Sequence, residues 1–283
     1  MKIHILTVAV LVLTTSTIFA ASKDFERTLK IDAAPTVSIS TGSGYIHLHP
    51  GSDNQIHIVG HVHSSNSWLN NDSDARVQQI VSNPPIVQNG NNITIGENHI
   101  RDLFRNIGID YEVTLPHASS IRANTGSGDV EIQDVGTTLK AESGSGSVRA
   151  RGIHGAADLQ TGSGDIELQQ TASGDVRAQT GSGSIRLSGL SGALKAGTGS
   201  GDIEVNGQPT SDWKLDTGSG SIHLTLGPSA RYTLNAGTGS GSIHTTQPIA
   251  MQGEINQHHV IGTVNGGGPT IHANTGSGDI SIL

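Results

Sequence analysis

A six-residue phrase, Thr-Gly-Ser-Gly-(Asp or Ser)-(Ile or Val), recurs along this 283-residue chain and limits what the chain can fold into. Copies of this corner phrase, some imperfect, begin at Thr41, Thr125, Ser143, Thr161, Thr180, Thr198, Thr217, Thr238 and Thr275. From Thr125 the spacing is 18 to 21 residues, apart from a last interval of 37. That interval predicts two units with one diverged corner between them. A short fixed period is typical of one structural unit that is copied and stacked.

Each unit reads as two short strands joined by the corner. In one unit Val176, Ala178 and Thr180 alternate with polar residues before the corner, and apolar alternation resumes after it. This period of two indicates half-buried strands. We expect Gly181 and Gly183 to tolerate no side chain, because one or both take a backbone conformation that other residues avoid. The corner threonine falls on the inward side, where its hydroxyl can reach a neighbouring backbone group.

Two architectures fit these units: a β-solenoid of parallel coils, or an antiparallel β-sandwich or meander. Outward charges alternate in sign from unit to unit and favour the solenoid slightly, because stacked coils would place opposite charges side by side. These charges are Glu131, Arg149, Glu167, Arg186 and Glu204. Burial decides more firmly, since the regular half offers no helix to cover a flat apolar face. We therefore predict an all-β solenoid with about 18–19 residues per coil, the repeat of the corner phrase.

The chain divides into three segments. Residues 1–20 read as a signal peptide, with Lys2 before an apolar run and Ala20 at a plausible cleavage site. Residues 21–118 form an irregular part with a short helix that begins at Asp72 or Ser73 and stops before Pro84. Residues 119–283 carry the regular repeat, and 24–283 form one continuous domain. No later segment is apolar enough to span a membrane, so we expect an exported mature chain: periplasmic, cell-surface or extracellular.

Three phrases in this order resemble the bacterial toast-rack, or "putative adhesin", domain family (DUF4097). They are Tyr111–Pro116 leading into Ser120–Thr125, the repeated corners, and Asn265–Thr270 running into Ile271–Ile280. The resemblance covers about residues 24–283. It implies a right-handed solenoid-like stack outside the cytoplasm, without known catalysis. It suggests a role in adhesion, surface scaffolding or envelope-stress sensing, and it supplies no active-site residues.

A basic row is the main candidate binding feature. Five basic residues stand three places before successive corners, interrupted only by Asp158: Arg122, Lys140, Arg177, Lys195 and Lys214. On a solenoid they would line one flank and attract an anionic surface polymer or lipid headgroups, unless they are ordinary solvated charge. The formal net charge of −8 argues against a nucleic-acid partner.

Two patterns raise the question of metal binding. By strand alternation, one outward face carries five imidazoles: His47, His49, His57, His61 and His63. Imidazoles two apart on a strand can chelate a divalent ion, although a polar solvated face explains them as well. The corner aspartates resemble those of calcium-binding rolls, but serine replaces them at Ser147, Ser184, Ser221 and Ser242. We therefore predict no metal and no cofactor.

Catalysis is the alternative to binding. Polysaccharide lyases and hydrolases on β-helices need an acid–base pair and commonly use aromatic platforms. Asp165 and Asp202 are two units apart, and aromatics are only 3% of the chain, with Trp213 and Tyr232 on the inward side. The sequence therefore predicts a non-enzymatic, adhesin-like or scaffold module that binds an envelope polymer or protein. A carbohydrate-active enzyme remains the alternative.

Overall fold

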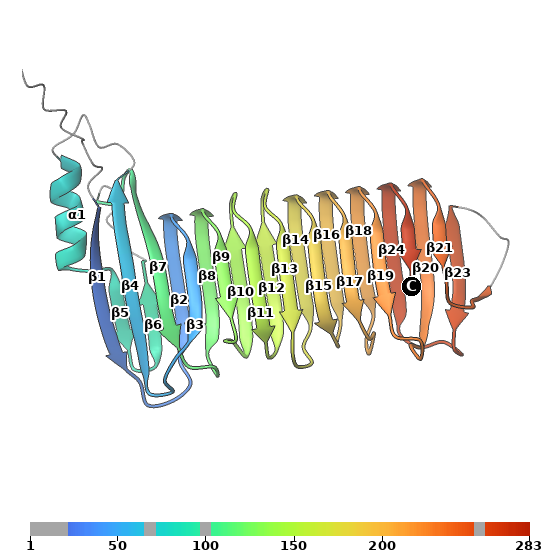
Figure 1. Cartoon of the computed structure of the whole chain (residues 1–283), viewed down its shortest axis with the longest axis horizontal. Helices are drawn as coiled ribbons and strands as arrows, with labels where there is room; N and C mark the ends of the chain where they lie inside the picture. The colour runs from blue at the N-terminus through green and yellow to red at the C-terminus, as the bar shows by residue number, and fades with distance from the viewer. Residues whose placement is uncertain (1–21, 65–71, 97–102, 252–257) are drawn as a thin grey trace, which may run out of the picture.

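The structure is a stack of coils whose strands form two long sheets. The computed structural model describes residues 22–64, 72–96, 103–251 and 258–283, so the expected signal peptide at 1–20 lies outside it. The strands form a 12-stranded sheet, here called sheet A, and a 13-stranded sheet, here called sheet B. Figure 1 shows them side by side along one axis, with helix α1 (Asp72–Ser82) at one end. The predicted all-β solenoid is confirmed, and the antiparallel alternative is wrong for the regular coils, which pair in parallel.

Each regular coil contributes one strand to sheet B, turns at the corner phrase, and contributes the next strand to sheet A. Identical positions lie beside one another in adjacent coils, so that Thr180 pairs with Thr161 and Thr198. The six successive coils are β8 (Ser120–Ser127) with β9 (Val130–Gln133), β10 (Thr138–Ser143) with β11 (Val148–Ile153), β12 (Ala156–Thr161) with β13 (Ile166–Gln170), β14 (Val176–Ser182) with β15 (Ile185–Leu190), β16 (Leu194–Ser200) with β17 (Ile203–Gly207), and β18 (Trp213–Ser219) with β19 (Ile222–Leu226).

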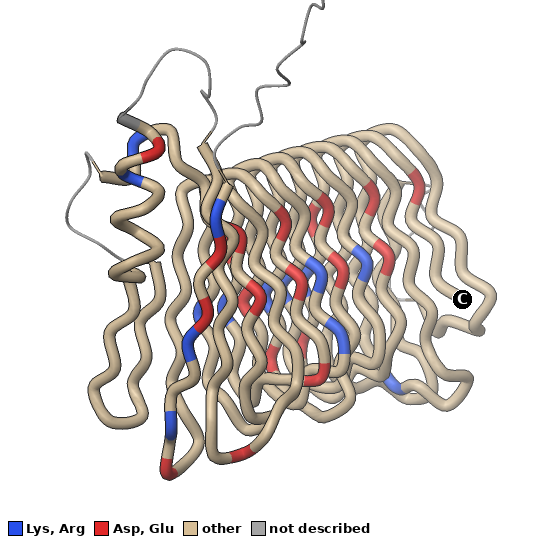
Figure 2. Tube along the Cα trace, turned by 60° about the vertical axis from the view of Figure 1, so that its left-hand side comes forward, with Lys and Arg blue, Asp and Glu red and all other residues tan. Residues whose placement is uncertain are grey.

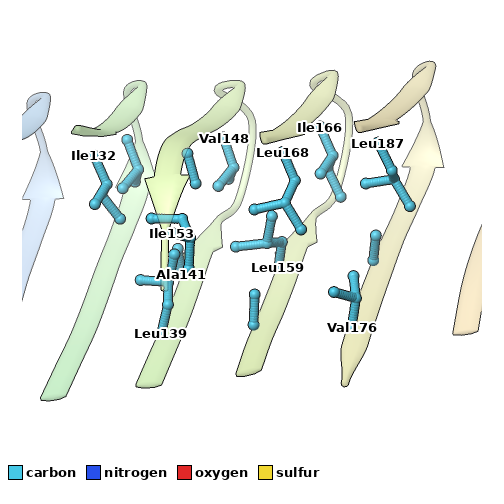
Figure 3. Packing of buried hydrophobic residues seen from close by; sticks show 14 of the residues in the cluster. Ile132, Leu139, Ala141, Val148, Ile153, Leu159, Ile166, Leu168, Val176 and Leu187 are labelled. Atoms are coloured by element: carbon cyan, nitrogen blue, oxygen red, sulfur yellow. The ribbon is translucent and has the colours of Figure 1, made fainter. Parts of the chain in front are cut away.

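The core is the narrow space between the two sheets. Leu139, Leu159 and Leu168 project into it from neighbouring coils, as Figure 3 shows. Small and branched side chains fill most of it, and each buried Leu or Ile contributes about 1.5–3 kcal/mol. Trp213 and Tyr232 are fully buried, as their inward positions in the alternating pattern predicted. The Trp213 indole N–H donates to the Gly192 carbonyl at 2.9 Å.

The N-terminal part joins the same stack and closes one end of it. Its strands are β1 (Ser22–Lys30), β2 (Thr36–Ser43), β3 (Ile46–Pro50), β4 (Gln55–Ser64), β5 (Ile86–Asn89), β6 (Asn92–Ile95) and β7 (Ile107–Leu115). β2 and β3 form a regular coil against β8 and β9, whereas β4 pairs antiparallel with β1 and β7. The helix predicted before Pro84 is present, and it buries Val77 and Ile80 beside β1 and β4.

The C-terminal part departs from chain order. It comprises β20 (Tyr232–Ser240), β21 (Ile243–Thr245), β22 (Ala250–Met251), β23 (His259–Val264), β24 (Thr270–Ser277) and β25 (Ile280–Ile282). The expectation of a diverged corner in the 37-residue interval is wrong, because β22 and β23 there run antiparallel. β23 covers the outer edge of β20, so the last coil, β24 with β25, lies between β18 and β20 instead of beyond them.

Each corner threonine ties its coil to the coil before it in the stack. Thr180 Oγ1 donates to the Gly164 carbonyl at 2.9 Å, and Thr161 and Thr198 repeat this contact. These side chains are buried, which confirms the inward hydroxyl that the sequence predicted. A hydrogen bond of this kind contributes about 0.5–1.5 kcal/mol, and leaving the carbonyl unpaired costs more.

The corner glycines are required by close contact between coils. A Cβ built on Gly181 would lie 2.5 Å from the Gly162 carbonyl oxygen, and one on Gly183 would lie 2.1 Å from that of Gly164. Neither residue has the left-handed φ that the sequence analysis expected, so that reason is wrong for this corner. It does hold at Gly201, where φ is +148°.

The fifth corner position is Tyr45 in the first coil and then alternates between aspartate and serine in the order of the stack. That order is Asp129, Ser147, Asp165, Ser184, Asp202, Ser221, Asp279 and Ser242. The Asp165 carboxylate accepts the Ser184 backbone N–H at 2.8 Å, and Asp129, Asp202 and Asp279 each do the same for the next serine. In chain order two serines, Ser221 and Ser242, would be neighbours, so only the inserted coil completes the alternation.

Replacing a stacked glycine should destabilise the protein while its counterpart at the end of the stack tolerates the change. We expect Gly181→Ala to lower the free energy of unfolding by about 1–3 kcal/mol, the usual cost of overpacking. Gly42→Ala is the matched control, because nothing lies within 4 Å of a Cβ built there. It should change stability by less than about 0.5 kcal/mol. Chemical denaturation measures both, and equal losses would contradict the role of coil contact.

Asp279 should make the C-terminal end of the stack sensitive to acid. Hydrogen bonds from the Ser242 backbone N–H and hydroxyl lower the pKa of Asp279. Because the folded-state pKa is the lower one, the stabilisation is present above the ordinary Asp pKa of about 3.9 and is lost as the pH falls through the lowered value. Asp279→Asn should therefore show a smaller fall in Tm between about pH 6 and about pH 3 than the wild type. An identical fall in both proteins would contradict this.

Candidate binding surface

The basic residues singled out from the sequence lie in one row across sheet B. Backbone register joins Arg122 to Lys140, then Asp158, Arg177, Lys195 and Lys214 on six successive strands. His272 of the inserted coil lies next to Lys214. Figure 2 shows charged residues recurring in rows across the stack. We call the five cations Arg122, Lys140, Arg177, Lys195 and Lys214 the sheet B row.

Neighbouring acids neutralise part of the sheet B row. The Lys140 amine lies 2.7 Å from Glu142, the Arg177 guanidinium 4.0 Å from Asp158, and the Lys214 amine 3.5 Å from Asp216. Within the described residues, Arg122 and Lys195 form no ion pair, and both are exposed. These two cations are therefore the most available to a ligand.

A shallow groove of about 500 Å³ follows the sheet B row. Its charged lining consists of four cations, Arg122, Lys140, Arg177 and Lys195, and two acids, Asp158 and Asp175. Its outward apolar lining is Ala156 and Ala193, whereas the side chains of Leu139, Ala157, Val176 and Leu194, which also border it, are buried in the core. The hollow lies over Ala156, whose side chain is exposed and is smaller than that of its register partner Thr138. The sequence analysis missed this groove, and an alanine at this outward position is the signal that could have indicated it.

Sheet A presents a different surface. Glu131, Arg149, Glu167, Arg186 and Glu204 lie side by side in that order, so the predicted ladder of alternating charge is confirmed. Ion pairs lie along it, including Arg186 with Glu204 at 3.7 Å and Arg151 with Glu167 at 2.9 Å. A pocket of about 350 Å³ opens here, lined by Glu167, Arg186, Glu204 and His223 with the polar residues Ser188, Asn206 and Thr225. Because Glu and Arg alternate from strand to strand, the outward face of sheet A carries little net charge.

The histidine face is divided between two strands. His47 and His49 lie on β3, and His57, His61 and His63 lie on β4, with β7 between the two strands. Carboxylates stand beside four of the five imidazoles: Glu131 at 3.9 Å from His47, Glu26 at 3.6 Å from His57, Asp24 at 2.9 Å from His61, and Asp110 at 3.6 Å from His63. The described part of the chain holds no group of three or more His, Asp or Glu arranged to bind a metal ion.

The aspartates considered for catalysis do not face one another across a cleft. The coil of Ser184 lies between Asp165 and Asp202, and each carboxylate accepts a backbone N–H at 2.8 Å. Phe25 and Tyr111 are buried, as are the two aromatics described above. Of the aromatic rings that the structure describes, Tyr45 and Phe104 alone are partly exposed. In the described ranges we find no helix with the length and apolar character that crossing a membrane requires.

We compared the chain with known proteins. Two solved structures match along most of their length. One is described as "a putative adhesin" from Bacteroides fragilis NCTC 9343, with a TM-score of 0.49 and 14% identity over 92% of this chain and 97% of that one. The other is described as "a putative cell adhesion protein" from Clostridium sporogenes ATCC 15579, with a TM-score of 0.26 and 13% identity over 92% of this chain and 99% of that one. No curated protein sequence matches significantly.

A family model described as Toastrack DUF4097 matches residues 34–283. The matched residues include every described corner phrase and both sheets of the stack, apart from β1 at the N-terminal edge. The chain belongs to the Toastrack DUF4097 family.

Proposed function

We propose that this protein is an exported, non-enzymatic, adhesin-like module of the cell envelope that holds an extended anionic polymer along the sheet B row. The observation that carries the proposal is the register of five cations along sheet B, four of which line one groove. Export rests on residues 1–20, whose composition is that of a signal peptide.

The spacing of the cations favours a polymer over a small ligand. Adjacent strands of a sheet are about 4.8 Å apart, so the sheet B row offers a cation at almost every step of that length. A small anion would meet one or two exposed cations, whose attraction is screened beyond about 8–10 Å at physiological ionic strength. A chain with one carboxylate on each sugar would meet many cations at once, and its sugar rings could lie against the outward-facing Ala156 and Ala193. Many weak contacts on one chain then act together.

Removing three of the four cations that line the groove should weaken binding to a polyuronate without unfolding the protein. We expect the triple variant Arg122→Gln, Arg177→Gln, Lys195→Gln to bind polygalacturonate about tenfold more weakly, since each exposed ion pair contributes up to about 1 kcal/mol. Isothermal titration at low salt measures the affinity. Wild-type binding should disappear as salt is raised, and neutral dextran should not bind.

The matched control makes the same change of charge on sheet A. Arg149→Gln, Arg151→Gln, Arg186→Gln removes three cations from the alternating face. It should leave the affinity for polygalacturonate within about twofold of the wild type, because those guanidinium groups lie on the opposite sheet. Equal losses in both variants, or binding that ignores salt, would move the binding surface elsewhere.

A carbohydrate-active enzyme is the second candidate, and the sheet A pocket is the observation that favours it. Glu167 and Glu204 line that pocket from two strands that flank β15, the strand of Arg186. Inverting glycosidases hold two carboxyl groups about 6.5–9.5 Å apart, close to twice the spacing of strands. Arg186 occupies the position between them, where such an enzyme would place water.

The protein should show no turnover on a panel of neutral and acidic polysaccharides. The physical reason is that both carboxylates on sheet A face guanidinium groups, and both corner aspartates accept backbone N–H groups. Reducing-end assays measure turnover. Cleavage that is lost in Glu167→Gln or Glu204→Gln, or in Asp165→Asn or Asp202→Asn, would establish the enzyme in place of the binding module.

A further inference from the structure

The last coil of the chain occupies a slot between two coils that precede it. β24 pairs in parallel with β18 on one side and with β20 on the other, and β25 does the same with β19 and β21. Figure 1 shows β24 between β18 and β20 near the C-terminal end of the stack. The slot is therefore a gap of one coil whose walls are both built by earlier residues.

Both walls recognise the corner phrase of the inserted coil. On one side, Thr275 Oγ1 donates to the Gly220 carbonyl at 2.8 Å, and the Asp279 N–H lies 3.3 Å from Ser221 Oγ. On the other side, Thr238 Oγ1 donates to the Gly278 carbonyl at 2.9 Å, and the Asp279 carboxylate accepts the Ser242 N–H at 2.8 Å. An aspartate-bearing coil fits between two serine-bearing coils, so the slot selects its occupant by sequence.

A short turn connects the slot to its occupant. Residues 265–269 link β23 to β24, and Asn265, Gly266 and Gly267 have φ values of +52°, +86° and +81°. The Gly267 N–H closes the turn on the Val264 carbonyl at 3.0 Å. A Cβ at Gly266 or Gly267 would meet no atom nearer than 3.6 or 3.5 Å respectively. The closed turn therefore needs these glycines for their φ and has space for a side chain.

We propose that the slot is a strand-exchange site for a second copy of this chain. The coil Thr270–Leu283 of one molecule fills the slot of its partner, and the partner's coil fills the slot of the first. Every contact that the coil makes within one chain is then made between two chains, so exchange changes only the hinge and the entropy of association. An extended hinge of five residues reaches about 17 Å. The proposal does not depend on the proposed function, although paired copies would offer two grooves to one polymer.

The first experiment strains the closed turn at residues 265–269 so that the extended hinge of the exchanged dimer becomes more favourable. Gly266→Val with Gly267→Val strains the closed turn through φ, and an extended hinge relieves that strain, because valine favours extended backbone. Size-exclusion chromatography with light scattering should show dimers whose share rises with protein concentration. Gly90→Val is the matched control: it places the same residue at a φ of +62° with nothing within 4 Å, in the turn between β5 and β6. That variant should stay at the wild-type mass.

The second experiment identifies which chain fills each slot and needs no change in the hinge. Ser219 and Ser277 are exposed register partners on β18 and β24, and the chain contains no cysteine. In the variant Ser219→Cys, Ser277→Cys, oxidation links the coil to whichever slot holds it. After refolding at increasing protein concentration, denaturing gels without reductant should show a covalent dimer in a rising share. The same pair in the hinge variant should convert its dimer fraction into that band.

Any of three outcomes would overturn the proposal. A hinge variant that stays monomeric at every concentration while its Tm falls would show that the coil does not leave its own slot. Dimers whose oxidised chains separate on the denaturing gel would show association through another surface. If the hinge variant fails to fold, the refolded Ser219→Cys, Ser277→Cys variant decides. A denaturing gel of that variant that shows monomer alone would also overturn the proposal.

Discussion

From Thr125 onward, the hydrogen bond from the corner threonine, or from Ser143 in its place, to a glycine carbonyl of the neighbouring coil is the contact on which the rest of the structure depends. This bond lies at the corner where the chain passes from a sheet B strand to a sheet A strand. Each bond therefore fixes the register of both sheets at once. The close approach that it requires leaves no room for a Cβ at the stacked glycines. The corner phrase is therefore a self-complementary surface, and copies of it stack on copies.

A self-complementary corner does not by itself specify the order in which the coils stack. If all corners were equal, any coil could stack on any other, and the chain would have several arrangements of similar energy. The alternation of aspartate and serine removes part of this ambiguity, because an aspartate placed beside a serine finds a backbone N–H partner and avoids another carboxylate. The antiparallel strand β23 removes more of it by covering the outer edge of β20. Together they direct the last coil into the slot between Ser221 and Ser242.

The same register gives the two faces of the stack their different chemistry. On sheet A the outward position alternates between Glu and Arg, and neighbouring charges cancel. On sheet B the equivalent position is cationic in five of the six coils, and Asp158 is the exception. A row of like charge on a stiff support loses little conformational entropy when an extended partner binds. This is the physical reason why we propose sheet B as the binding surface.

The coil, the inward threonine and tryptophan and the basic row were predictable from the sequence, because each depends on a local pattern with a period of two residues or one coil. The helix before Pro84 was predictable from its own local start and stop signals. The position of Asp279, the groove over Ala156 and the separation of the histidine face by β7 emerged only in the folded protein. Those features depend on which strands become neighbours in space. The reason is that a repeated, self-complementary corner specifies how any two coils stack, whereas which two coils meet is decided by edge-covering strands such as β23 and by non-local pairing.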